Sequence, residues 1–167
     1  MERPVKRFSA SIGLALLLLV ALALPVSAGD QRPIRGQFTG SGVDVGQRCP
    51  GALTIGFAID GTLSHLGRMT GDGSNCTEFT LGTGSVAIWD GIATISAADG
   101  STLILSYEGQ QGPPANGSAA FVHSDSVVGG TGRFANATGQ LTVQGLIDFS
   151  AFPDVTVSGT VSGWINY

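Results

Sequence analysis

Apolar and polar residues alternate with a period of two through most of the chain after residue 28. The pattern is clearest in two C-terminal segments, 141–149 and 155–165, where Leu, Val, Ile, Phe or Gly occupies every second position. This period places alternate side chains on opposite faces of a β-strand. Beyond the N-terminal region, no stretch keeps helical spacing for more than one turn. Eight to ten half-apolar segments predict an all-β protein, a single antiparallel barrel of about eight strands, because closure leaves no unpaired edge.

Three Asp-Gly pairs, at residues 60–61, 90–91 and 99–100, predict tight turns between strands. The first turn joins the segments on either side of it into a hairpin, and the other two, closely spaced, define a meander. The predicted strands before the C-terminal pair are 34–45, 52–59, 62–70, 76–81, 85–89, 92–97, 102–107 and 117–128, with loops at 70–75 and 109–116.

The N-terminus has the composition of a secretory signal peptide. Basic residues precede an uninterrupted apolar run from Ile12 to Leu24, and Val26-Ser27-Ala28 supplies the small residues that a signal peptidase requires. We therefore expect residues 1–28 to be removed and residues 29–167 to form one β-barrel domain that is secreted or periplasmic. The run is short for a membrane span and no second one follows, so we expect no membrane association after cleavage.

Charge and composition exclude several classes of function. The predicted mature chain has no lysine, which excludes Schiff-base chemistry, and it has five arginines against eleven carboxylates, a balance of −6. Nucleic acid is therefore a poor partner. The carboxylates are dispersed singly, so we expect no metal site, and nothing in the sequence calls for a cofactor. No Gly-x-Ser-x-Gly motif supports a serine hydrolase.

The two cysteines, Cys49 and Cys76, are expected to form a disulfide bond. They are an even number in a chain predicted to reach an oxidising compartment, and their spacing offers no further ligands for a metal. A bridge across 27 positions would stabilise the fold by about 3 kcal/mol through restriction of the unfolded chain.

Four side chains are candidates for proton transfer or ligand contact: His65, Tyr107, His123 and Asp125. The alternation places His65 on the apolar face of its strand, where it is either a core residue or a base. If Phe121 faces the interior, then His123 and Asp125 do too, and the acid could orient the imidazole. The alternative is a polar pair on the outer wall, and the pattern leaves both open.

A glycine-dense corner, Val-Val-Gly-Gly-Thr-Gly-Arg-Phe-Ala-Asn-Ala-Thr-Gly at 127–139, suggests a family. We expect it to join two barrel strands, with Phe134 filling one end of the barrel; a phosphate-binding loop is disfavoured because no Gly-Lys-Ser/Thr and no helix follow. The segment resembles the Gly-Gly-Thr/Ser-Gly-x-Phe-x-x-Ala/Val-x-Gly sequence of the allene oxide cyclase and dirigent proteins and their bacterial secreted relatives. Ser64-His65-Leu66-Gly67-Arg68 is a second point of similarity.

The resemblance implies an eight-stranded barrel with an apolar interior pocket. It assigns no catalytic residue, because the strand at 34–45 has no glutamate where a cyclase-like acid would be sought. Our first hypothesis is a non-catalytic barrel that binds a small hydrophobic molecule against Leu63, His65, Tyr107 and Phe121. The alternative is an isomerase or cyclase acting on an apolar substrate. A lipocalin is less favoured because no Gly-x-Trp motif opens the first strand, and the oligomeric state is left open.

Overall fold

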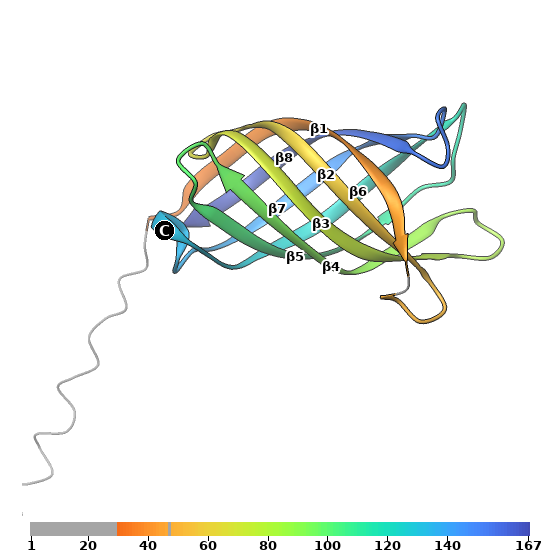
Figure 1. Cartoon of the computed structure of the whole chain (residues 1–167), viewed down its shortest axis with the longest axis horizontal. Helices are drawn as coiled ribbons and strands as arrows, with labels where there is room; N and C mark the ends of the chain where they lie inside the picture. The colour runs from red at the N-terminus through yellow and green to blue at the C-terminus, as the bar shows by residue number, and fades with distance from the viewer. Residues whose placement is uncertain (1–29, 47) are drawn as a thin grey trace, which may run out of the picture.

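A computed structural model describes residues 30–46 and 48–167, which form one closed antiparallel barrel of eight strands (Figure 1). Each strand pairs with the next along the chain, and β8 pairs with β1 to close the ring. The predicted all-β barrel is thus confirmed, while the predicted signal peptide at 1–28 lies outside the described residues. The strands are β1 (Arg32–Gly46), β2 (Leu53–Leu63), β3 (Gly67–Phe79), β4 (Val86–Ala97), β5 (Thr102–Gln111), β6 (Ser118–Gly130), β7 (Thr138–Asp148) and β8 (Val155–Asn166).

Strand β1 contains glycines that face the barrel interior. A Cβ atom at Gly36 or Gly40 would collide with the carbonyl oxygens of Thr62 and Ala58 on β2. Glycine therefore permits the close approach of β1 and β2 that a strongly coiled strand requires. The first predicted strand, at 34–45, is confirmed over its full length, and the observed strand is slightly longer at both ends.

The predicted turn at Asp60-Gly61 is wrong, because both residues lie inside β2. Asp60 pairs with Thr39 on β1 and with Thr70 on β3, and Gly61 takes the inward position between Phe38 and Met69. The strand continues to Leu63, and the chain turns at 64–66 instead. The predicted loop at 70–75 is wrong for the same reason, since those residues lie within β3.

The predicted turn at Asp90-Gly91 is also wrong, because it marks a β-bulge within β4. The pairing with β5 shifts between Ile88 and Gly91, which leaves Trp89 and Asp90 unpaired on that side. Asp90 has a φ of 48°, a left-handed conformation that aspartate tolerates at turns and at bulges alike. The Asp-Gly pair therefore marks an irregularity within a continuous strand, and the chain does not reverse there.

The third Asp-Gly pair and the glycine-dense corner are confirmed. Asp99-Gly100 forms the turn between β4 and β5, where Oδ1 of Asp99 accepts a hydrogen bond from the Ser101 backbone N–H at 3.0 Å. The corner joins β6 to β7 through a short 3₁₀ helix, η1 (Gly132–Phe134). The side chain of Phe134 is completely buried, as expected for a residue that closes one end of the barrel.

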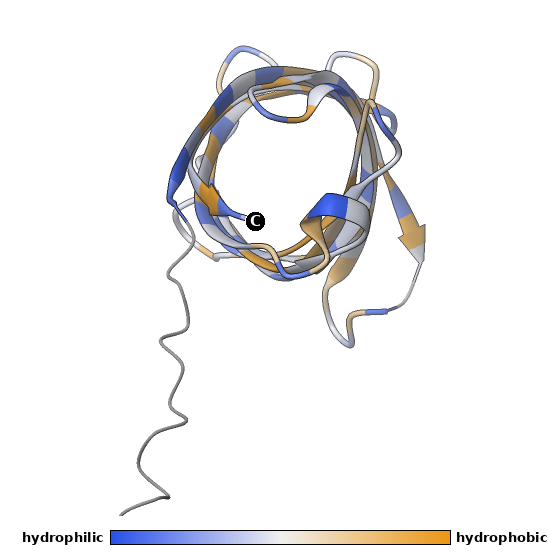
Figure 2. Ribbon diagram, turned by 90° about the vertical axis from the view of Figure 1, so that its left-hand side faces the viewer, coloured by the Kyte–Doolittle hydropathy of each residue, from blue (hydrophilic) through white to orange (hydrophobic). Residues whose placement is uncertain are grey.

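The two ends of the barrel differ. Figure 2 views the end at which the C-terminus lies, and in this view the C-terminus falls inside the ring of strands; η1, between β6 and β7, is at the same end. We call this the closed end, because its fully buried side chains pack into a core: Ile34, Leu66, Leu103, Phe134 and Ile165. The open end carries the loops at 47–52, 80–85, 112–117 and 149–154. Within the described residues, no helix has the length and hydropathy needed to cross a membrane.

Candidate functional site

A cavity of about 1070 Å³ is lined by residues of β1, β2, β5, β6, β7 and β8, at the ends of β2 and β5 and near the start of β6. The strand register explains why space is left there. Gly145 and Gly159 pair directly across β7 and β8, and Gly61 occupies an inward position beside Phe38. Three inward positions without a side chain leave a void that the neighbouring aromatic rings of Phe38 and Phe121 only partly fill.

The lining of the cavity combines two buried aromatic rings and one buried amide with exposed polar residues of the same strands, among them Gln37 and Gln144. Phe38 and Phe121 are each 6 % exposed, and Gln111, on β5, is 8 % exposed. Gln111 pairs across the sheet with Phe121, so the amide and the ring are neighbours. The lining also includes Ser85 and Gly112 near the loops of the open end, which places the access route to the cavity there.

An aromatic ladder runs from the cavity wall deeper into the barrel. The ring of Phe121 lies 4.9 Å from that of His123, which stacks on Tyr107 at 4.9 Å with an interplanar angle of 22°. The Tyr107 hydroxyl donates a hydrogen bond to Oδ1 of the buried Asn75 at 3.0 Å. Burial lowers the pKa of His123 to about 4, so its imidazole is neutral at physiological pH.

Asp125 lies beyond this ladder, directly opposite Tyr107 across β5 and β6. Its side chain is 4 % exposed, and its Oδ1 atom is sealed from solvent without a hydrogen-bond partner among the described residues. Burial raises the pKa of this carboxyl to about 7, and burial, followed by the nearby Asp125 charge, raises the pKa of Tyr107. Of the two arrangements left open by the sequence, the structure therefore shows the interior one for His123 and Asp125.

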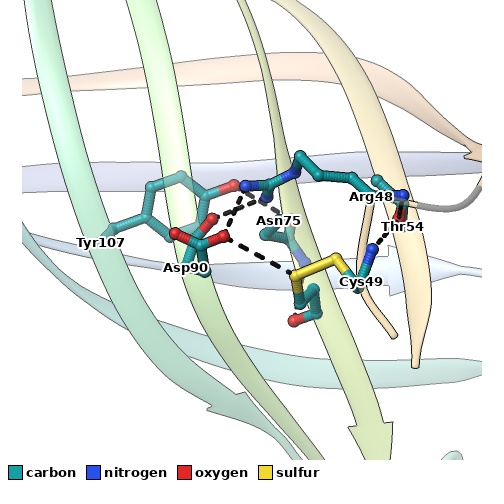
Figure 3. A network of polar contacts seen from close by, with 7 residues as sticks. Arg48, Cys49, Thr54, Asn75, Asp90 and Tyr107 are labelled. Carbon is teal, nitrogen blue, oxygen red and sulfur yellow. Dashed lines mark hydrogen bonds and ion pairs between the residues drawn. A yellow bond between two sulfur atoms is a disulfide. The ribbon is translucent and has the colours of Figure 1, made fainter. Parts of the chain in front are cut away.

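A polar clasp holds the β1–β2 loop at the open end (Figure 3). Cys49 and Cys76 form the expected disulfide bond, and the backbone N–H groups of Arg48 and Cys49 both donate to Oγ1 of Thr54, at 3.0 and 3.2 Å. The Arg48 guanidinium binds both the side chain and the carbonyl oxygen of Asp90, at 2.6 and 2.7 Å. The clasp thereby fixes the loop to the bulge of β4, close to Tyr107.

The prediction that His65 points inward is wrong. His65 lies in the exposed β2–β3 turn with a φ of 67°, and its Nε2 atom is 3.1 Å from the carbonyl oxygen of Pro33. Alternation placed it inside only because the turn was expected at Asp60-Gly61. Leu63 is buried in the core near the closed end, and it does not line the cavity.

Two interior polar residues, Gln111 and Asn75, were missed. Both were assigned to loops in the sequence analysis, although Gln111 continues the inward series of β5 that begins at Leu103. Extending the alternation through Gly109 would have found it. Asn75 had no comparable signal, because a bulge between Ser74 and Cys76 shifts the register of β3 there. In residues 30–46 and 48–167, no three His, Cys, Asp or Glu side chains gather into a potential metal site.

Comparison with known proteins adds one structural likeness. No family model and no curated protein match the sequence. A solved structure described as a pterocarpan synthase dirigent protein is similar with a TM-score of 0.42 and 17 % identity, over 83 % of this chain and 93 % of that one. A likeness of this size says nothing about the activity of the present chain.

Proposed function

We propose that the barrel binds a small hydrophobic molecule in its interior. The observation that carries the proposal is the cavity of about 1070 Å³ between Phe38 and Phe121, in a barrel whose other end is packed solid. Cavities of roughly 300–1,000 Å³ with mostly apolar walls and a few polar groups are typical of small-molecule sites.

Burial of an apolar ligand in the cavity would be favourable, because it removes apolar surface from water. A ligand that buries about 300 Å² of apolar surface would gain about 7 kcal/mol at roughly 25 cal/mol per Å². Lost translational freedom and ordering reduce that gain, so we expect micromolar rather than nanomolar affinity for a generic apolar compound. A Cβ atom at Gly145 or Gly159 would collide with a backbone carbonyl of the facing strand, so neither position can carry a side chain that fills the cavity.

Binding of Nile red, a neutral environment-sensitive dye, tests the proposal. We expect saturable enhancement of its fluorescence with the wild-type protein and a loss of affinity in Phe121→Trp, because the larger ring fills the cavity. Val128→Trp is the matched control, since Val128 lies on the same strand but is 59 % exposed on the outer wall. Absence of saturable dye binding, or equal binding by both variants, would contradict a binding function.

A second candidate function is an isomerase or cyclase, and Asp125 is the observation in its favour. A buried acid with a pKa of about 7 is suited to give or take a proton near neutral pH. Its free oxygen is nevertheless sealed behind the aromatic ladder, out of reach of a molecule in the cavity. We therefore prefer binding. A ligand-bound structure with Asp125 in contact with the ligand would reverse that preference.

We also propose that the protein is exported. The disulfide bond is compatible with an oxidising compartment, either extracellular or periplasmic. Protein recovered from the medium or periplasm should have the intact mass of a chain that begins at Gly29. Recovery of the full chain with its N-terminal apolar run would contradict export by signal cleavage.

A further inference from the structure

A polar side chain of the cavity wall, Gln111, has a second polar side chain, His123, as its neighbour deeper in the barrel. Gln111 and His123 both point into the barrel from neighbouring strands, because Gln111 pairs with Phe121 and His123 pairs with Gly109. They are therefore diagonal neighbours on one face of the sheet, a placement that puts their side chains within reach of a single small group.

Both side chains have hydrogen-bonding capacity that the protein leaves unused. Among the described residues, neither the Gln111 amide nor the His123 ring makes a hydrogen bond, and yet the sealed polar atoms without a partner belong only to Asp125 and Asn166. The amide and the imidazole therefore keep accessible surface. Gln111 lines the cavity, so its accessible surface can meet a ligand there. His123 is not part of the cavity lining, but it faces the barrel interior directly behind Phe121 and beside Gln111, so a polar group of a ligand bound against Gln111 would be near the imidazole.

No arginine or lysine is among the described residues that line the cavity. The five arginines of the described chain are all exposed residues, and Arg48, at the open end, is committed to Asp90. The other four arginines do not line the cavity: Arg32, Arg35, Arg68 and Arg133. A carboxylate drawn into the cavity would lose its hydration without gaining a counter-charge, which is costly.

We propose that Gln111 and His123 form the polar subsite of the cavity and select an uncharged ligand whose polar group both donates and accepts hydrogen bonds, such as a carboxamide or an alcohol. This inference rests on the proposed binding function. The amide of glutamine offers two donors and one acceptor, and a neutral imidazole offers one of each, so the pair complements such a group from two sides.

The neutrality of the imidazole supports this selectivity. Burial keeps His123 uncharged at physiological pH, so it supplies no cation for an acidic ligand. Burial likewise keeps Asp125 largely protonated below neutral pH, which shows that the interior disfavours net charge of either sign.

Displacement of Nile red by three compounds with the same apolar chain tests the inference: decanamide, decanol and decanoate, at pH 7 and below their micellar concentrations. We expect decanamide and decanol to bind at least about tenfold more tightly than decanoate. Gln111→Leu and His123→Phe should each lower the affinity for decanamide by about tenfold more than they change the affinity for Nile red. Gln140→Leu, which changes an exposed glutamine on the outer wall, is the control and should leave the preference unchanged.

The outcomes separate this inference from the function on which it rests. If Nile red binds and decanoate competes as well as decanamide, the polar subsite is refuted while the binding function stands. If no compound and no dye binds, both are refuted. Should either interior variant fail to fold, the side-chain amide resonances of Gln111 in the wild-type protein decide the matter, since a shift with decanamide is expected and no shift overturns the assignment.

Discussion

Replacement of Asp125 by Asn should stabilise the protein at neutral and alkaline pH and have little effect in acid. Burial raises the pKa of the carboxyl from 3.8 to about 7, so its proton is held about three powers of ten more tightly in the folded chain. Each power of ten is worth about 1.4 kcal/mol, which gives about 4 kcal/mol in total. Asn has nearly the same shape and never ionises.

The direction of the pH dependence follows from whether the folded or the unfolded chain binds the Asp125 proton more tightly. Below pH 3.8 the carboxyl is protonated in both states and contributes nothing to the pH dependence. Between pH 3.8 and about 7 the unfolded chain ionises while the folded one does not, so the stability of the wild-type protein falls as pH rises. Above a pH of about 7 the carboxyl is ionised in both states, and its ionisation lowers the stability of the wild-type protein no further.

His123 acts in the opposite direction over nearly the same range. Burial lowers its pKa from 6.5 to about 4, so the unfolded chain binds more protons there and stability rises by about 3 kcal/mol between those values. In the wild-type protein the two contributions largely cancel. In Asp125→Asn the free energy of unfolding should therefore rise with pH because of His123. In His123→Phe it should fall with pH because of Asp125.

Urea unfolding followed by the fluorescence of the two tryptophans, at half-unit steps from pH 4.5 to 8, measures these free energies. We expect the difference between Asp125→Asn and wild type to grow by about 1.4 kcal/mol per pH unit up to pH 6.5. Asp72→Asn, at an exposed position on β3, controls for the change in net charge. A difference for Asp125→Asn that stays constant across the range would show that the carboxyl is not desolvated as the structure indicates.

Two further experiments, on the disulfide bond and on Phe134, test what holds the barrel together. Replacing both Cys49 and Cys76 by Ser should lower the free energy of unfolding by about 3 kcal/mol, because the unfolded chain is no longer closed across 27 positions; a loss well under 1 kcal/mol would mean that the bridge restricts little. Phe134→Ala should cost about 3–5 kcal/mol, since its ring is fully buried at the closed end, whereas Phe152→Ala, at a 76 % exposed loop position, should cost little. Equal thermal stability of these two phenylalanine variants would contradict the interpretation that Phe134 closes one end of the barrel.

Local sequence signals were sufficient for the class of fold and for most of its strands. Alternation with a period of two is a property of neighbouring residues, so it identified β1, β6, β7 and β8 without knowledge of their partners. The corner at Gly129–Phe134 and the turn at Asp99-Gly100 were likewise correct, because a left-handed or closely approached backbone position is encoded by the glycines themselves.

The same kind of signal failed where its meaning depends on a neighbouring strand. Asp60-Gly61 lies within a strand because β1 pairs with both residues, Gly61 opposite Phe38. Asp90-Gly91 lies at a bulge because β5 pairs with β4 on both sides of it. An Asp-Gly pair permits a backbone irregularity, but only the pairing partners decide whether the chain reverses, bulges or continues. His65 was misplaced as a consequence of the first of these decisions.

The candidate site is determined more by how the strands pair than by the sequence of any one strand. The sequence itself determined that His123 and Asp125 share a face with Phe121, because that follows from alternation alone. Which face lies inside was decided by barrel closure, and the cavity arose from glycines on three different strands that meet only through the register. Gln111 became a partner of His123 in the same way, since a contact between residues on separate strands is set by how the strands pair and not by either strand alone.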